Sequence, residues 1–159
     1  MNRNDINATA TSRPREDHRA RRWVTSALLL VAAGSHVPLV PEHLREAPYV
    51  GWSFIVLSVT CVLLAAWIVL VDQVAVWLLS AAVCLGALVA FLASRTVGLP
   101  QIGDEVGNWT EPLGFPAVLS EALVVVLAGT HLRTALTTRA RMVAERPPAP
   151  EPEDRRRGC

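Results

Sequence analysis

Two side chains that can exchange protons or bind ions lie inside otherwise apolar segments of this chain. His36 falls near the end of the apolar run 23–40, and Glu121 falls within the run 113–132. Ionisable groups in such segments are costly and usually face the interior of a helical bundle or a watery cavity. Arg95 ends a third apolar run, and its long side chain can reach toward them. We therefore expect His36, Arg95 and Glu121 to form one buried polar cluster.

The three residues fall at similar depth if the runs are helices. At about 1.5 Å per residue, Glu121 lies about 12 Å inside its helix and His36 lies roughly 6 to 9 Å from the end of the first. One interpretation is a structural clamp, in which His36 and Arg95 satisfy Glu121 and fix the helix register. The other is a pocket open to the outside that handles a proton, a metal ion or a small polar ligand. The candidate metal ligands are then His36, His43 and Glu121.

The segment "SRTVGLP" is expected to hold Arg95 at the rim of this cluster. Gly98 supplies the backbone freedom that a turn needs, and Pro100 stops the helix from resuming. The chain then folds back over the outer mouth of the bundle, where Arg95 can pair with Glu121 or Glu111. The nearby acids either line the mouth of the pocket or are solvated loop residues: Glu42, Glu46, Asp104, Glu105 and Glu111.

Four apolar segments position these residues. Hydrophobic residues make up 52% of the 159 residues, the mean hydropathy is +0.34, and no charged residue occurs in 47–71 or 73–94. Both runs exceed the roughly 18 to 20 residues that a helix needs to span a bilayer. The sequence predicts helices over 23–40, 49–71, 74–94 and 113–132. The predicted fold is all-α: a four-helix transmembrane up-down bundle in the lipid bilayer.

Charge is concentrated at the two ends of the sequence. Residues 1–22 are polar, lack an apolar stripe and are predicted to form a disordered cytoplasmic arm. The transmembrane domain covers 23–132. The basic, Pro-rich segment 133–159 is predicted to be a disordered cytoplasmic tail. The two loops on the side opposite the termini contain only two arginines, Arg45 and Arg95. The positive-inside rule therefore predicts a multi-pass cell-membrane protein with both termini in the cytoplasm. An alternative makes 23–40 a cleaved signal peptide, but the long polar leader favours an uncleaved anchor.

Small residues recur every four positions in the third apolar run, at Ala82, Gly86, Ala90 and Ser94. Such a ridge lets a second helix approach closely in a membrane. Since Asp72 and Gln73 form a very short loop, the ridge is expected to pack against the preceding helix. The alternative is a contact between two copies of the chain.

Cofactor and enzyme motifs are missing from the sequence. A bis-histidine haem needs two histidines at matching depth on facing helices, and the four histidines offer no such pair. No phosphate loop, Ser-His-Asp order or HExxH occurs, and the cysteines form no CxxC pair. The Arg-rich ends are explained by topology and anionic-lipid contacts, so no nucleic-acid partner is predicted. We expect no cofactor and favour a protein that is not an enzyme.

Two segments, "GSHVPLVPEHLREAPYVGW" and "SRTVGLP…EPLGF…SEAL", resemble a family of small four-span integral membrane proteins of actinobacteria. The most specific piece of the resemblance is S-R-T-x-G-L-P, at residues 94–100. The resemblance implies the four-span topology and the outer cluster, and it implies no activity.

The favoured hypothesis is a structural or accessory membrane protein with an outward-facing polar cluster, which works with a membrane-protein partner or as a homo-oligomer. The alternative is a metal- or proton-binding sensor or carrier that uses His36, Arg95 and Glu121.

Overall fold

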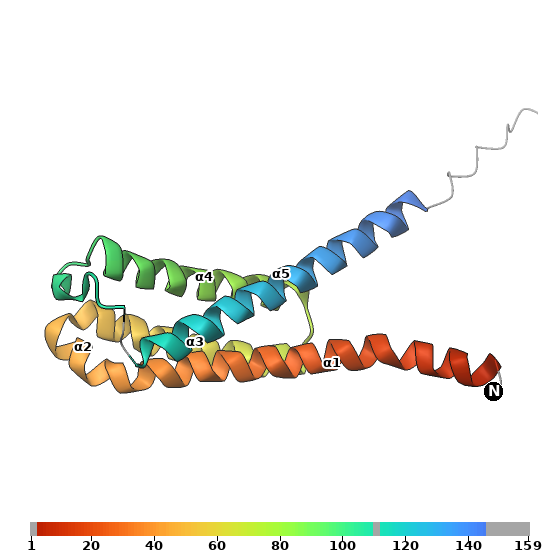
Figure 1. Cartoon of the computed structure of the whole chain (residues 1–159), viewed down its shortest axis with the longest axis horizontal. Coiled ribbons are helices and arrows are strands. Elements are labelled where there is room, and N and C mark those ends of the chain that lie inside the picture. The colour runs from red at the N-terminus through yellow and green to blue at the C-terminus, as the bar shows by residue number, and fades with distance from the viewer. Residues whose placement is uncertain (1–2, 110–111, 146–159) are drawn as a thin grey trace, which may run out of the picture.

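The computed structural model describes residues 3–109 and 112–145 of the chain (Figure 1). This part of the chain is almost wholly helical, and its helices are, in order, α1 (Arg3–His36), η1 (Val37–Leu39), α2 (Val40–Glu46), α3 (Pro48–Leu70), α4 (Val74–Thr96), η2 (Gly103–Glu105) and α5 (Gly114–Ala144). The predicted all-α bundle is confirmed.

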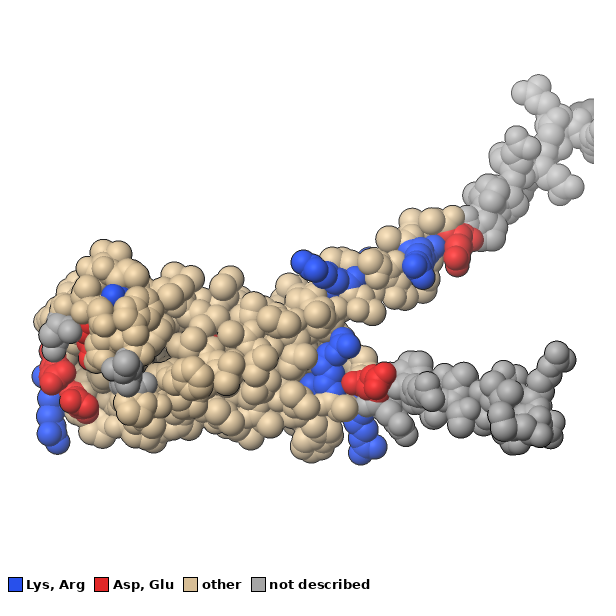
Figure 2. Space-filling model, viewed as in Figure 1, with Lys and Arg blue, Asp and Glu red and all other residues tan. Residues whose placement is uncertain are grey.

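Four segments of the described chain are long and apolar enough to cross a membrane: Asp17–Glu46, Pro48–Leu70, Val74–Thr96 and Gly114–Ala144. Short connections make consecutive segments run in opposite directions (Figure 1). Charged side chains gather at the two ends of the bundle and leave the middle of the visible face nearly bare of charge (Figure 2). The chain is therefore a multi-pass membrane protein, with an Arg-rich end at which α1 begins and α5 ends, and a loop end that carries α2 and the α4–α5 connection.

The terminal helices are longer than their apolar runs. α1 already includes residues for which the sequence predicts a disordered arm, and α5 continues past Leu132 to Ala144, away from the other helices (Figure 1). The rest of the predicted tail, 146–159, lies outside the described residues. The structure thus places helix on both sides of the predicted domain borders at residues 23 and 132.

The segment "PEHLREAP" forms a helix rather than a simple connection. Pro41 occupies the first turn of α2, where a missing N–H costs nothing. α2 then folds back onto the start of α3, so closely that a Cβ at Gly51 would lie 2.7 Å from both the backbone nitrogen and the Cγ of Leu44. Glycine at position 51 is what permits this reversal.

The main core lies between α1, α3, α4 and α5. Leu29, Ala32, Ile68, Trp77 and Val124 are among its fully buried members. Two hydroxyl groups also join α1 to α3: Ser26 Oγ donates to the carbonyl of Ala65 at 3.1 Å, and Ser58 Oγ donates to that of Ala33 at 3.2 Å. Small residues and hydroxyl-to-carbonyl bonds are how helices associate where lipid removes the hydrophobic drive.

The residues of the predicted ridge are not buried in the structure. Ala82, Gly86 and Ala90 are exposed and Ser94 is half-buried. α4 lies against α5 along much more of its length than against α3, although the two share core residues such as Cys61 and Cys84. The short loop brings the two helices together at the Arg-rich end, while toward the loop end the ridge faces a cavity instead of a helix. A small-residue pattern shows which face permits close approach, and it does not show which helix occupies it.

The connection between α4 and α5 folds over the loop end of the bundle, as the "SRTVGLP" segment predicts. Gly98 follows the end of α4 with a φ of 79°, and its N–H donates to the carbonyl of Ala93 at 3.0 Å. Ile102 is buried against Ala47, which joins α2 to α3, and against Val50 in the first turn of α3. This connection covers the loop end of the cavity.

Candidate functional site

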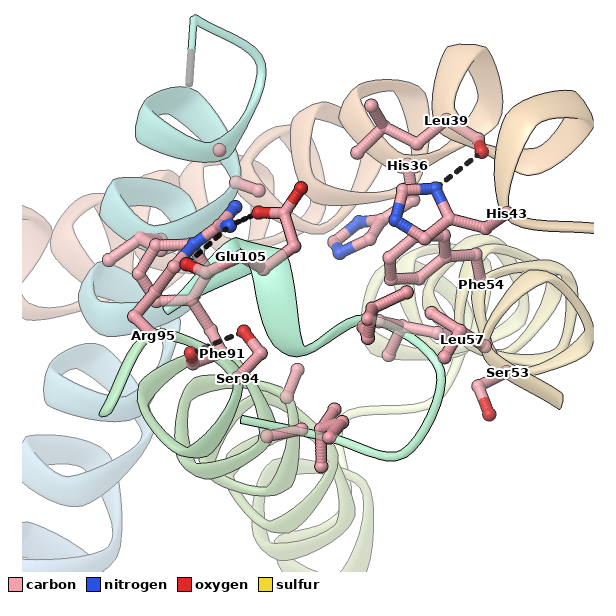
Figure 3. Close-up of a pocket in the computed structure, with 18 of the residues that line it drawn as sticks. His36, Leu39, His43, Ser53, Phe54, Leu57, Phe91, Ser94, Arg95 and Glu105 are labelled. Carbon is pink, nitrogen blue, oxygen red and sulfur yellow. Dashed lines mark hydrogen bonds and ion pairs between the residues drawn. The ribbon is translucent and has the colours of Figure 1, made fainter. Parts of the chain in front are cut away.

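A cavity of about 380 Å³ lies at the loop end of the bundle, between α1, α3, α4, α5 and the α4–α5 connection. Its walls are mostly apolar, with Phe54 and Leu57 on α3 and Phe91 on α4 among the residues shown in Figure 3. His36, Arg95 and Glu121, which the sequence predicts to lie together, all line it. The side chain of each is almost fully buried, with whole-residue exposures of 7%, 5% and 2%.

His36 and Glu121 approach each other inside this cavity. His36 Nε2 lies 3.8 Å from Glu121 Oε1, although the residues come from the first and last spanning helices. The depth argument from the sequence had placed them at the same level. Glu121 Oε1 is fully buried and has no hydrogen-bond partner among the described residues. A buried polar oxygen without a donor is rare and needs an explanation.

The other side of the His36 ring shows which proton states the pair can adopt. Nδ1 lies 2.7 Å from the carbonyl oxygen of Ala32, and because a carbonyl only accepts, Nδ1 must carry the ring proton. A neutral His36 therefore presents Nε2 as an acceptor toward the Glu121 carboxylate, which is also an acceptor. One added proton would turn this contact between two acceptors into an attractive one.

Arg95 pairs with Glu105 rather than with Glu121. The guanidinium forms an ion pair with the Glu105 carboxylate and donates to the Glu105 backbone carbonyl at 3.4 Å (Figure 3). It also lies 5.1 Å above the centre of the Phe91 ring. The expected Arg95–Glu121 ion pair is not found among the described contacts, and the other expected partner, Glu111, lies outside the described residues.

The remaining residues of the predicted pocket divide into two groups. His43 lines the cavity and packs its ring 5.0 Å from that of Phe54, while its Nδ1 bonds to the carbonyl of Leu39 at 2.9 Å (Figure 3). Glu42 and Glu46 are exposed on α2 and do not line the cavity. His36, His43 and Glu121 do not form a set of three atoms within reach of one ion in the part of the chain that the structure describes.

Sequence analysis missed a second group of polar side chains, at the Arg-rich end. His18, Asp72 and His131 come together from α1, the α3–α4 loop and α5. The sequence predicts a disordered arm over residues 1–22, and His18 lies in it. For that reason no histidine is expected at the depth of His131. Had residue 18 been predicted as part of the first helix, His18 would have been placed at the same end of the bundle as Asp72 and His131.

Comparison of the chain with protein-family models, with curated proteins and with solved structures found no match. The function must therefore be argued from the cavity and its residues.

Proposed function

We propose that this protein is a non-enzymatic membrane protein that binds one small amphiphilic molecule, an apolar body with a protonated amine, in the cavity at the loop end. The observation that carries the proposal is the fully buried Oε1 of Glu121 in the wall of that cavity, which accepts no hydrogen bond from the described residues. The volume of about 380 Å³ falls within the range of small-molecule sites, about 300 to 1,000 Å³.

The charges around the cavity favour a cationic head group. Arg95 is the one arginine among the described residues of its wall, and Glu105 forms an ion pair with it. Glu121 then remains as an acid without an arginine partner among the described residues. An ammonium group supplies up to three donors and a compensating charge, and hydrogen bonds to charged groups are the stronger ones.

The apolar walls favour a hydrocarbon body, and the fold offers it a route from the bilayer. α3 and α4 both line the cavity, and Gly86 and Ala90 on the α4 side are exposed. No atom lies within 4 Å of the position that a Gly86 Cβ would take. A chain dissolved in the membrane can therefore reach the cavity past the small residues of α4.

The test uses the full-length protein in lipid nanodiscs and three probes of equal chain length: octylamine, octanol and octanoate. We expect octylamine to raise the melting temperature in a saturable way, and octanol and octanoate to raise it much less. Because these probes also dissolve in lipid, Glu121→Gln is the matched control: it keeps the shape of the side chain and removes the charge. An equal rise in Glu121→Gln means that octylamine acts through the bilayer, and the proposal then fails.

A second candidate function is proton binding by the His36–Glu121 pair. The 3.8 Å separation of His36 Nε2 from Glu121 Oε1, which becomes an attractive contact when one proton is added, favours it. It predicts that liposomes containing the protein take up protons across an imposed gradient, and that both His36→Gln and Glu121→Gln abolish the uptake. Uptake without any octylamine effect would favour this function over amine binding.

We further propose an accessory role within a larger membrane assembly or a homo-oligomer, with the loop end outside the cell and both termini in the cytoplasm. The arginine distribution supports this orientation, and the exposed apolar side chains of α5 beyond the bundle, among them Leu136 and Val143, support a partner. The S-R-T-x-G-L-P segment supports membership of the actinobacterial four-span family. Co-purification from mild detergent tests the accessory role independently of ligand binding.

A further inference from the structure

Three side chains that commonly bind transition metals converge at the Arg-rich end of the bundle. One ligand atom each of His18, Asp72 and His131 lies within 4.8 Å of the other two. The side chains are partly exposed, and they lie at the opposite end of the bundle from the cavity described above.

The spacing of the atoms matches a metal-binding geometry. Zinc binds imidazole nitrogen and carboxylate oxygen at about 2.0 to 2.2 Å, so two ligands on a tetrahedral ion lie about 3.4 Å apart. His18 Nδ1 lies 3.4 Å from Asp72 Oδ2. One ring nitrogen of His131 lies within 4.8 Å of the ligand atoms of His18 and Asp72. A small movement of the His131 side chain would bring this nitrogen to an ion held by the other two residues.

The surroundings of Asp72 and His131 hold both side chains in place. The indole N–H of Trp77 donates to Asp72 Oδ1 at 3.0 Å, while Asp72 Oδ2 lies on the side of His18. The same indole ring stacks on His131, with ring centres 4.3 Å apart. Trp77 is itself fully buried. An outer partner that orients a ligating carboxylate is a regular feature of metal sites and tunes their affinity.

The backbone that carries Asp72 is fixed as well. Arg22 of α1 donates from Nε to the carbonyl of Ile68 at 3.0 Å and from a terminal nitrogen to the carbonyl of Val69, which satisfies the last turn of α3. The loop is thereby tied to α1 one turn after His18. The positions of His18 and Asp72 are coupled before any ion arrives.

We propose that His18, Asp72 and His131 bind one divalent transition-metal ion, with zinc as the best-fitting member of the class and water in the remaining position. Imidazole ligands suit zinc, copper, nickel and iron, and the mixed nitrogen and oxygen set disfavours magnesium and calcium. The ion joins α1, the α3–α4 loop and α5. It therefore stabilises the Arg-rich end, where the terminal helices extend beyond the bundle.

The test is a zinc titration of the full-length protein in nanodiscs after removal of metal with a chelator. We expect one zinc ion per chain and a rise in melting temperature on binding. His18→Ala is the informative variant because its side chain is 41% exposed, so its removal leaves no buried cavity. Its zinc affinity should fall by more than about 100-fold, since loss of outer-shell partners alone costs about 10- to 100-fold. Asp72→Asn should weaken binding as well.

Two control variants keep the result specific. Asp17→Asn removes an exposed carboxylate next to His18, and His43→Ala removes an imidazole at the loop end; both should keep wild-type zinc affinity. Absence of saturable zinc binding by the stripped wild-type protein overturns the proposal. A loss of affinity in His43→Ala without one in His18→Ala overturns it too, and would place the metal in the cavity.

Discussion

Replacing Arg95 by alanine should destabilise the protein, and the second substitution that restores stability identifies its partner. Arg95 is 5% exposed and the side chain of Glu105 is 25% exposed. Breaking a buried ion pair costs about 3 to 5 kcal/mol, while an exposed pair contributes about 0.2 to 1 kcal/mol. A pair with one buried and one quarter-exposed partner falls between, so we expect Arg95→Ala to cost about 2 kcal/mol of unfolding free energy.

A double-mutant cycle separates the pair from the other contacts of Arg95. Combining Arg95→Ala with Glu105→Gln should show a coupling of about 1 to 2 kcal/mol, because coupling in one ion-pair network is typically 0.5 to 3 kcal/mol. Combining Arg95→Ala with Glu121→Gln should show a smaller coupling than the pair with Glu105, because the ion pair described for Arg95 is the one with Glu105. The contact of Arg95 with the Phe91 ring is lost in both arms and cancels.

The assay is reversible unfolding of the full-length protein in mixed lipid–detergent micelles, with all variants measured at one protein concentration. The sequence alone predicts that Arg95 pairs with Glu121, whereas the structure pairs it with Glu105. The two double variants therefore compare these two pairings directly. A coupling with Glu121 that exceeds the coupling with Glu105 would refute the contact geometry at the rim of the cavity.

Three other predictions concern the turn, the ridge and the topology. Gly98→Ala should lower the unfolding free energy by about 1 to 2 kcal/mol, because the φ of 79° at this position disfavours a side chain. The matched variant Gly103→Ala should change the unfolding free energy by less than about 0.5 kcal/mol in the same micelle assay. Gly86→Leu should leave the melting temperature nearly unchanged, against the overpacking that the ridge predicts, because nothing lies within 4 Å of its Cβ position; a large drop would mean that a helix covers this face in the membrane. Cysteine placed at Glu46 should be labelled from outside intact cells, and cysteine placed at Thr138 only after permeabilisation. Labelling of both from the same side would contradict the hairpin topology.

Hydrophobicity along the sequence was sufficient to predict the spanning helices. The uncharged runs 47–71 and 73–94 contain most of α3 and α4, and the one residue between them, Asp72, marks the loop. In a bilayer each apolar run must satisfy its own backbone, so length and charge alone indicate a helix and its approximate ends. The same reasoning failed at the terminal helices, since α1 and α5 continue into polar sequence where hydrophobicity gives no signal.

The axial position of the polar residues was also readable from the sequence. Residue count along two spanning helices predicts that His36 and Glu121 lie at similar depth, and packing of the helices then brings them to 3.8 Å. Gly98 was recognisable as the turn because few other residues tolerate a positive φ.

Rotation about the helix axes and the choice of neighbours were decided only by the tertiary structure. Residue count gives the depth of Arg95 but not the position of Glu105, which the folded connection brings beside it. The ridge on α4 faces a cavity because α4 packs against α5, and no local pattern encodes that preference. His18, Asp72 and His131 lie far apart in the chain, and they meet because α1 is already helical before its apolar run begins at residue 23. Apolar length determines that a segment spans and how deep each residue lies, whereas packing among several helices determines which side chains touch.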